Sequence, residues 1–274
     1  MASFGGAIYF LKGGSAGNAL WRTDGTTTVR VAALPADARQ LMQIGSRLMF
    51  TVQPVGGCEL WSSDGTAAGT SKVLSLCSSN SRTPQMFTPA GDRLFFAADP
   101  VGAGLDLWVT DGSTAGTRRV VDQVMAPYGG GIRQIGSGGR VLFGGFDAAH
   151  GHEAWVSDGT AAGTRRLADT EPGAGHGYPR DFVRLGNQVL FTSRDTAHGL
   201  ELWSLPVAST EAWAVEHIKY VNTMVFPLVW LARKLRGPNG STRSEEYVPP
   251  RGINRLLRWI FVQTAVTRWW PAPF

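Results

Sequence analysis

Short runs of alternating hydrophobic and polar residues follow one another along the first three quarters of the chain, with Gly, Asp, Asn or Thr between them. In the unit that ends at Asp169, the runs are residues 132–135, 140–143, 153–157 and 164–169. Alternating runs of this length between turn residues predict short antiparallel β-strands joined by hairpins.

Two aromatic residues recur at a fixed offset in this pattern. Five tryptophans are spaced 40, 47, 47 and 48 residues apart, and each follows a phenylalanine by 11 or 12 residues. The tryptophans are Trp21, Trp61, Trp108, Trp155 and Trp203, and the phenylalanines are Phe10, Phe50, Phe96, Phe143 and Phe191. Two landmarks that keep their register through five copies indicate an internal repeat.

An acidic turn follows each of the first four tryptophans, and it begins Asp-Gly-Thr or Asp-Gly-Ser. Its aspartates are Asp24, Asp64, Asp111 and Asp158. An aspartate at the start of a turn accepts hydrogen bonds from N–H groups two or three residues further on. These tryptophans and aspartates could also be ligands. A residue that recurs in every unit, however, meets a need that every unit shares, so we expect the whole set to serve packing and turns.

The strands before and after this turn bring a cation opposite each tryptophan. The predicted pairs are Trp21 with Arg30, Trp61 with Lys72, Trp108 with Arg119, and Trp155 with Arg166. Stacking of the cation on the indole is the hypothesis for these pairs.

Four short antiparallel strands with a period near 47 residues predict an all-β fold, a β-propeller-like array of about five four-stranded blades over residues 1–204. A jelly roll does not repeat its sequence, and a leucine-rich horseshoe has about half this period. Counting strands from the first residue gives three, four, four, four and three. We therefore expect an open array, incomplete at both ends, whose unpaired edges favour self-association.

The unit resembles the bacterial ELWxxDGT repeat, whose fuller pattern runs roughly ELWxxDGTxxGTxxVxD. The second copy carries the likeness in Glu59-Leu60-Trp61-Ser62-Ser63-Asp64-Gly65-Thr66 and Gly69-Thr70. The resemblance extends over residues 4–204, although the first copy lacks the Ala-Gly of the loop and the fifth lacks a fourth strand. It implies an extracellular or cell-surface bacterial protein without enzymatic activity, while no signal peptide is visible after Met1.

Charge and composition change near residue 205. The formal net charge is +5, but residues 1–204 carry 17 basic and 17 acidic side chains, so the excess belongs to residues 205–274. Of the 35 glycines, 32 precede residue 205. The sequence therefore predicts a second region, 205–274. It also argues against nucleic acid as a partner, because no basic and aromatic stripe covers the neutral repeats.

This second region predicts a strand at 214–222, an apolar helix at 223–235, a polar loop at 237–252 and an amphipathic helix at 253–270.

The order resembles the C-terminal end of class I SAM-dependent methyltransferases over residues 211–274. The carrying residues are Val215-Glu-His-Ile-Lys-Tyr-Val-Asn-Thr223, Phe226-Pro227-Leu228, Val248-Pro-Pro250 and Pro271-Ala-Pro-Phe274. The SAM-binding half of that family is absent, so the resemblance brings no active site. A fusion or a frameshift would explain the join.

A rival interpretation of this region is contact with a membrane surface. Trp259, Trp269 and Trp270 lie near arginines, a combination found at bilayer interfaces. The apolar run 224–232 is too short to span a bilayer. We favour a pair of helices that would have packed on a sheet that is missing from this chain.

Three further features carry weaker signals. His150 and His198 each follow an Asp by three residues, which could indicate a metal but is more typical of a turn. Residues 173–177 imitate a glycine-rich nucleotide loop, yet neither a strand before them nor a helix after them is predicted, so we expect a connection between blades. Cys58 and Cys77 are diagonal across a hairpin, which leaves a disulfide with a small register shift and two free thiols as alternatives.

The sequence thus predicts a non-catalytic repeat module for binding or scaffolding, with a protein or carbohydrate as ligand. It points to no catalytic, cofactor-binding or metal-binding residue. The alternatives are a truncated SAM-dependent methyltransferase fragment fused to a propeller, and a peripheral membrane protein that binds through its C-terminal region.

Overall fold

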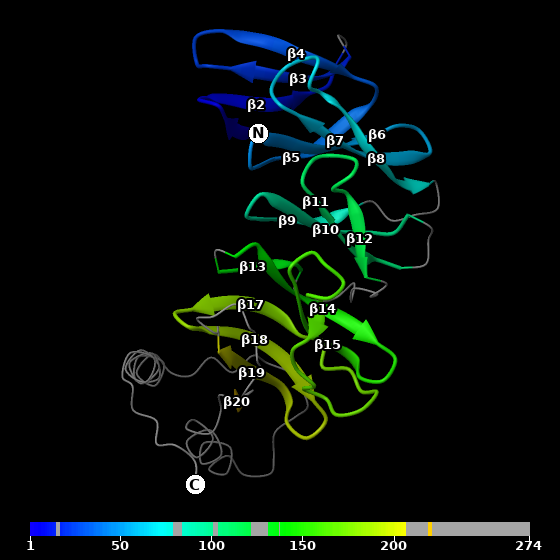
Figure 1. Cartoon of the computed structure of the whole chain (residues 1–274), viewed down its shortest axis with the longest axis vertical. Coiled ribbons are helices and arrows are strands. Elements are labelled where there is room, and N and C mark those ends of the chain that lie inside the picture. Colours follow the sequence, from blue (N-terminus) through cyan, green and yellow to red (C-terminus); the bar gives the residue numbers. More distant parts are fainter. Residues whose placement is uncertain are drawn as a thin grey trace, which may run out of the picture. The chain divides into compact units, whose positions relative to one another are not determined.

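The computed structural model describes residues 1–14, 17–78, 84–100, 104–121, 131–136, 138–206 and 219–220. These residues form strands that pair into five separate four-stranded antiparallel sheets (Figure 1). In each sheet the spatial order of the strands is their order along the chain. The described part of the chain is therefore all-β, and its sheets have the arrangement of propeller blades.

The blades are numbered from the N-terminus. Blade 1 contains β1 (Ala2–Phe4), β2 (Ala7–Lys12), β3 (Asn18–Thr23) and β4 (Thr28–Leu34). Blade 2 contains β5 (Asp37–Ile44), β6 (Arg47–Gln53), β7 (Gly57–Ser63) and β8 (Ser71–Ser78). Blade 3 contains β9 (Gln85–Ala90), β10 (Arg93–Ala98), β11 (Asp106–Thr110) and β12 (Arg118–Val121). Blade 4 contains β13 (Arg133–Ile135), β14 (Arg140–Asp147), β15 (Gly151–Ser157) and β16 (Arg165–Arg166). Blade 5 contains β17 (Arg180–Leu185), β18 (Gln188–Asp195), β19 (Gly199–Pro206) and β20 (Lys219–Tyr220).

The expectation that the first and last blades are incomplete is wrong. In blade 1, a tight turn at Gly5 and Gly6, both at positive φ, folds Ala2–Phe4 back on β2 as a short first strand. In blade 5, Lys219–Tyr220 pairs with β19 and supplies the fourth strand. The sequence does predict a strand at 214–222 but assigns it to a separate region. The repeat motif cannot reveal this pairing, because a long connection separates β20 from its partner.

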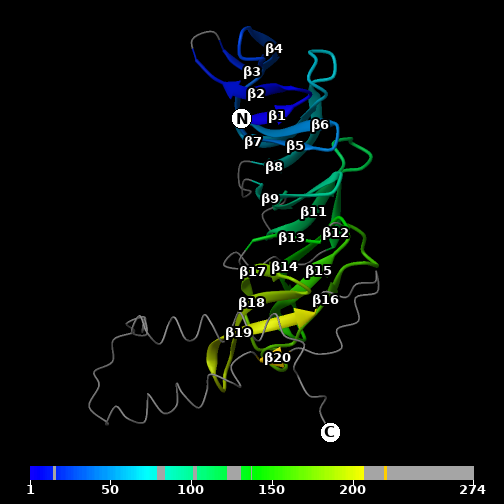
Figure 2. The ribbon, with the colours of Figure 1, turned by 90° about the vertical axis from the view of Figure 1, so that its left-hand side faces the viewer.

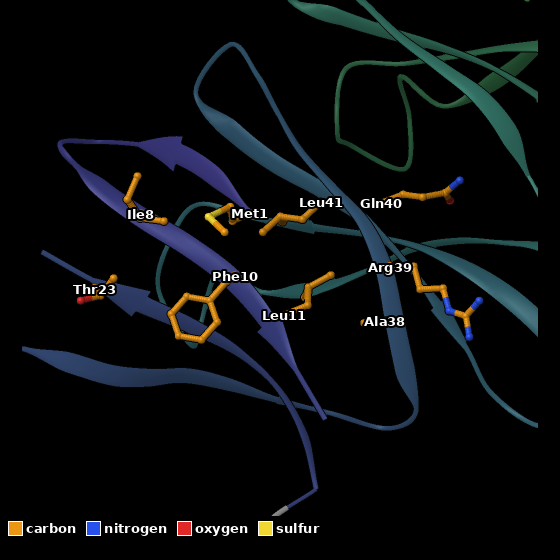
Figure 3. A pocket seen from close by; sticks show the side chains of 9 residues that line it. All are labelled: Met1, Ile8, Phe10, Leu11, Thr23, Ala38, Arg39, Gln40 and Leu41. Atoms are coloured by element: carbon orange, nitrogen blue, oxygen red, sulfur yellow. The ribbon is translucent and has the colours of Figure 1, made fainter. Parts of the chain in front are cut away.

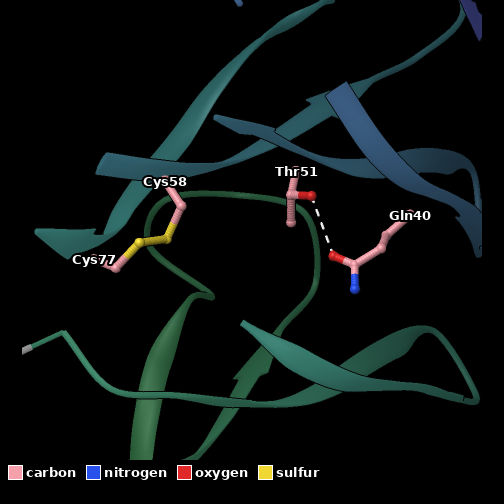
Figure 4. The surroundings of a disulfide bond; sticks show 4 residues. All are labelled: Gln40, Thr51, Cys58 and Cys77. Atoms are coloured by element: carbon pink, nitrogen blue, oxygen red, sulfur yellow. Dashed lines mark hydrogen bonds between the residues drawn. A yellow bond between two sulfur atoms is a disulfide. The ribbon is translucent and has the colours of Figure 1, made fainter. Parts of the chain in front are cut away.

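Glycine at positive φ forms the turns between the first two strands of the blades. Gly45, Gly91 and Gly186 have φ values of 47°, 65° and 58°, as the two-residue hairpins predicted from the sequence require. Five residues before these glycines, in the first strand, Gln40, Met86 and Asp181 also have positive φ, and a bulge interrupts the pairing there. In blade 2, the Thr51 hydroxyl lies 3.1 Å from Gln40 Oε1 (Figure 4). A repeated bulge of this kind bends the strand and increases its twist.

Each blade packs on its neighbours through two different faces, because successive side chains of a strand point to opposite sides of its sheet. We call the face toward the next blade the leading face and the face toward the previous blade the trailing face. In blade 3, Phe95 lies on the leading face and Phe96 on the trailing face, and both are fully buried. The five blades therefore follow one another in chain order and share a core at every junction (Figure 2).

The predicted helices at 223–235 and 253–270, with the methyltransferase resemblance and the membrane-surface tryptophans, lie outside the described residues. The compact unit to which the blades belong extends from Met1 to Met224. In the described residues, no helix has the length and hydrophobicity that crossing a membrane requires.

Cys58 of β7 and Cys77 of β8 form a disulfide, with their Cα atoms 5.2 Å apart (Figure 4). The register between the two strands shifts beside Cys58, so that Cys58 lies opposite Cys77 while Glu59 lies opposite Ser75. This is the small register shift that the sequence requires for a bond, and the alternative of two free thiols is wrong for this structure.

Removal of this bond is expected to lower the free energy of unfolding by about 3 kcal/mol, because a cross-link of this span restricts the unfolded chain. The variant Cys58→Ser/Cys77→Ser is compared with the oxidised wild type in urea unfolding. A reducing agent should destabilise the wild type by the same amount and leave the variant unchanged. Equal stability of oxidised and reduced wild type would contradict the prediction.

Candidate binding site

The repeated tryptophans lie on the third strand of each blade, directly opposite the repeated phenylalanines of the second strand. In the first three blades the two rings stack. The centroid distances are 6.5 Å for Phe10–Trp21, 6.4 Å for Phe50–Trp61 and 6.2 Å for Phe96–Trp108. Aromatic pairs across adjacent strands stabilise a sheet beyond the area they bury. The shared Phe-to-Trp offset in the sequence therefore corresponds to a cross-strand pair.

The predicted cation lies opposite the tryptophan in each of the first four blades. In blades 2, 3 and 4, however, the charge of this cation is directed to a carboxylate. Lys72 Nζ lies 3.1 Å from Glu59 Oε1, and Arg119 Nη1 lies 3.2 Å from Asp106 Oδ2. A cation is stacked on a repeat tryptophan in blade 1, where Lys12 Nζ lies 5.5 Å from the Trp21 ring. The register was predictable from the sequence, but the partner of the cation was not, because it depends on side-chain reach across the sheet.

The four repeated aspartates begin the turn between the third and fourth strands. In each, Oδ1 accepts the backbone N–H of the residue two positions on, at 2.8–2.9 Å. The hydroxyl of that residue donates to the same oxygen in all four turns. The hydroxyl and N–H of Thr66 lower the pKa of Asp64, and Ser113 does the same for Asp111. Burial raises the pKa of Asp158, but the hydrogen bonds from Thr160 outweigh it, so that the net pKa is lowered.

The variant Asp158→Ala should lose about 0.5–2 kcal/mol of unfolding free energy, as a helix or turn does when its cap is removed. Thermal unfolding measures the loss. The control is Asp92→Ala, a hairpin position whose side chain is 87% exposed. An unchanged melting temperature for Asp158→Ala would show that the turn does not depend on this carboxylate.

The same turn predicts a pH dependence. A carboxyl whose pKa is lowered by folding stabilises the fold above its unfolded pKa of about 3.9, and this contribution disappears as the pH falls through the folded pKa. In the variant Asp158→Asn, an amide oxygen still accepts hydrogen bonds but does not titrate. We expect the wild type to lose more stability than this variant between about pH 5 and pH 2. Parallel pH profiles of the melting temperature would refute this.

A groove of about 560 Å³ lies beside β2, bordered by β5 of the next blade (Figure 3). Its lining residues are Met1, Ile8, Phe10, Leu11, Thr23, Ala38, Arg39, Gln40 and Leu41. The groove exists because β1 is three residues long whereas β5 has eight, so β1 pairs with β2 only as far as Tyr9. The lining is mostly apolar, and Leu11, Ala38 and Leu41 also pack against the core between blades 1 and 2.

Residues that break the repeat gather at the junction of blades 4 and 5. Phe146, His152, His176 and Tyr178 form one cluster of rings, in which the two histidines lie between the phenylalanine and the tyrosine. Centroid distances are 4.9 Å for Phe146–His152, 5.1 Å for His152–His176 and 5.1 Å for His152–Tyr178. Tyr178 is 38% exposed and His176 is exposed as well. The cluster therefore offers aromatic surface with hydrogen-bonding edges to solvent.

The connection between the two blades is held in place by backbone hydrogen bonds to this cluster. The N–H groups of Gly177 and Tyr178 both donate to the His152 carbonyl, at 3.0 and 3.1 Å. The His152 N–H donates to His176 Nδ1 at 3.2 Å, so a neutral His176 carries its proton on Nε2. Tyr178 has a φ of 49°, in the left-handed region, although it is a bulky residue followed by Pro179. Strain of this kind is commonly found at functional sites.

A fully buried carboxylate supports the cluster from below. Glu153 Oε2 accepts the N–H and the hydroxyl of Thr170, at 2.9 and 2.7 Å, and Oε1 accepts the Glu171 N–H at 3.1 Å. Ser193 Oγ lies 2.7 Å from the Thr170 hydroxyl and donates to the Gly177 carbonyl. Burial raises the pKa of Glu153, against the effect of the hydrogen bonds from Thr170. The network joins blade 4 to blade 5 and allows no side chain at Gly177.

His150 and His198 do not belong to the ring cluster. In each, the imidazole Nδ1 forms a hydrogen bond with the carboxylate of the aspartate three residues earlier, as a turn requires. The distance between His150 Nδ1 and Asp147 Oδ1 is 2.8 Å. Among the described residues, no group of three or more His, Cys, Asp or Glu side chains lies close enough to hold a metal ion. Burial and the neighbouring His176 lower the pKa of His152, so its ring is neutral at neutral pH.

Sequence reasoning missed the cluster because His152 and His176 showed no pattern with a partner. Residues 173–177, which imitate a nucleotide loop in the sequence, form the connection that brings His176 against His152 of blade 4. The one sequence signal for the cluster is that residues 173–177, at the junction of blades 4 and 5, depart from the repeat.

Comparisons with known proteins show distant likenesses to solved structures. No family model matches the chain, and no match was found among curated proteins. Among solved structures, TolB from Acinetobacter baumannii is similar, with 14% identity and a TM-score of 0.39 over 75% of this chain and 53% of that one. Putative TolB from Agrobacterium tumefaciens is 11% identical, with a TM-score of 0.41 over 77% of this chain and 76% of that one. The β-propeller domain of the trilobed protease from Pyrococcus furiosus is 14% identical, with a TM-score of 0.32 over 79% of this chain and 80% of that one.

The chain spans about half the length of the Acinetobacter TolB. The fold is argued from the five four-stranded sheets of this chain, which give it a β-propeller-like arrangement, and its function must likewise be argued from its own residues.

Proposed function

We infer that this protein is a non-catalytic binding or scaffolding module whose ligand, a protein or a carbohydrate, contacts the ring cluster of Phe146, His152, His176 and Tyr178. The observation that carries the proposal is the gathering of non-repeating aromatic residues at one junction. The repeated tryptophans and aspartates are engaged in pairs and turns within their own blades, so a site with specificity needs residues that differ between blades.

The chemistry of the cluster favours recognition over turnover. Aromatic faces with a few fixed polar groups orient a ligand, and Tyr178 and His176 provide such edges. The buried Glu153 network fixes the cluster from beneath, because each carboxylate oxygen already accepts hydrogen bonds from the connecting segment. A site held by its supporting residues in this way is rigid before a ligand arrives, which lowers the entropic cost of binding.

The test uses the full chain on two immobilised panels, one of oligosaccharides and one of peptides. Tyr178→Ala should abolish binding to the hits of either panel, because it removes an exposed ring of the cluster. The matched control is Val55→Ala, which changes an exposed side chain on another blade. Hits that both variants retain would refute the assignment of the site.

Catalysis is tested separately. The purified chain is incubated with SAM and methyl acceptors, and with peptide and ester substrates. Turnover in either assay would overturn the non-catalytic assignment and favour the enzyme alternatives. The ELWxxDGT resemblance adds the expectation of a bacterial surface location, which fractionation of the source cells would check.

A further inference from the structure

The trailing face of blade 1 lacks the cover that the same face has in the other four blades. Ile8 is 39% exposed, whereas the residues at its repeat position are fully buried. These residues are Leu48, Leu94, Val141 and Val189. Phe10 is partly exposed, whereas its four equivalents are at most 1% exposed. In blades 2–5, the preceding blade provides the missing cover.

The leading face of blade 5 likewise has apolar side chains that no following blade covers in the described part of the chain. Leu185 is 52% exposed, whereas Ile44, Ala90 and Ile135 at the same repeat position are at most 3% exposed. Val183 and Leu200 add to this face and are 59% and 53% exposed. Blade 5 thus presents an apolar surface of the kind that blades 1–4 bury against the next blade.

These two exposed faces are the two halves of one interface. The chain forms that interface four times, each time between a leading face and the trailing face that follows it. Polar contacts accompany the apolar ones. At the junction of blades 3 and 4, Arg93 Nη1 donates to the Asp158 carbonyl at 2.7 Å, and Arg118 Nη2 donates to the Gly159 carbonyl at 2.8 Å.

The turn of blade 1 retains the conformation that these polar contacts recognise. Gly25 has a φ of 94°, close to the 90°, 89° and 87° of Gly65, Gly112 and Gly159 in the other turns. Ile8 and Phe10 of this face also line the groove beside β2 (Figure 3). Blade 1 therefore keeps both the apolar and the polar parts of a junction on its trailing side.

We propose that the trailing face of blade 1 binds the leading face of blade 5 of a second copy of this chain, in a head-to-tail contact that reproduces the junction between consecutive blades. Both faces are exposed in the same molecule, so they do not cover one another within one chain. A second copy carries the complementary apolar surface in Leu185, Val183 and Leu200. Because the contact joins two different faces, it leaves one free face at each end and permits chains longer than a dimer.

The experiment is sedimentation velocity of the full chain over a wide range of concentration. The wild type should associate as its concentration rises. Ile8→Glu and Leu185→Glu each place a charge in the proposed contact and should weaken self-association roughly a hundredfold. Both positions are exposed in the monomer, so circular dichroism and the melting temperature should stay unchanged. Val55→Glu, at a fully exposed position away from both faces, is the control and should associate like the wild type.

Mixing the two variants distinguishes this contact from any other. The Ile8→Glu chain keeps its blade 5 face and the Leu185→Glu chain keeps its blade 1 face, so an equimolar mixture should form heterodimers that grow no further. The double variant should not associate with itself.

Two results would overturn the proposal. One is a wild type that stays monomeric at every concentration. In that case, a lower melting temperature of the Ile8→Glu variant would indicate that another part of the same chain covers the trailing face of blade 1. The other is association that neither variant weakens, which would place the contact on a different surface. Neither result bears on ligand binding at the ring cluster.

Discussion

Replacing Glu153 with Ala is expected to lower the free energy of unfolding by about 3 kcal/mol, because it leaves the buried N–H groups of Thr170 and Glu171 without an acceptor. The loss is measured by urea unfolding at neutral pH. The released connection should also let His176 and Tyr178 move away from His152, which hydrogen exchange at the Gly177 amide would detect.

Glu59→Ala is the matched control for this prediction, since Glu59 occupies the same repeat position in blade 2. Its carboxylate accepts the Trp61 indole N–H and pairs with Lys72, whose side chain is 48% exposed. A half-exposed pair of this kind contributes about 1 kcal/mol or less. Equal losses in the two variants would show that the Glu153 network has no special part in joining blades 4 and 5.

Replacing Phe143 with Ala should cost about 3–5 kcal/mol, the usual range for a large side chain removed from a packed core. Phe143 is fully buried between blades 3 and 4. Phe10→Ala is the control at the equivalent position of blade 1, where the ring is partly exposed, and we expect about half the loss at concentrations where the chain is monomeric. A loss at Phe10 as large as that at Phe143 would mean that the face of blade 1 is covered in solution.

The comparison of these two phenylalanines shows how far sequence reasoning extends. The shared offset to the tryptophans indicates that both occupy the same place in the repeat, and in the structure each lies opposite its tryptophan. Burial differs between them because it depends on a neighbouring blade, which the local pattern of one unit does not contain.

The candidate site was less accessible to sequence reasoning than the fold. His152 and His176 are 24 positions apart, and neither belongs to a motif, so nothing in the sequence indicates that their rings meet. Glu153 occupies the same repeat position as Glu59, yet one is fully buried and the other forms an ion pair with Lys72. The difference arises from the segment between blades 4 and 5, whose path is set by its hydrogen bonds to Glu153 and to the His152 carbonyl.

The sequence by itself determined the strand pattern, the glycine turns, the aspartate caps and the cation opposite each of the first four tryptophans. Each of these depends on contacts between residues near in the chain or repeated at a fixed offset. Tertiary structure alone decided that Lys219–Tyr220 completes blade 5, that Lys72 and Arg119 pair with carboxylates, and that four rings meet beside Glu153. It also decided which apolar faces remain exposed, because burial depends on what the rest of the chain places against each residue.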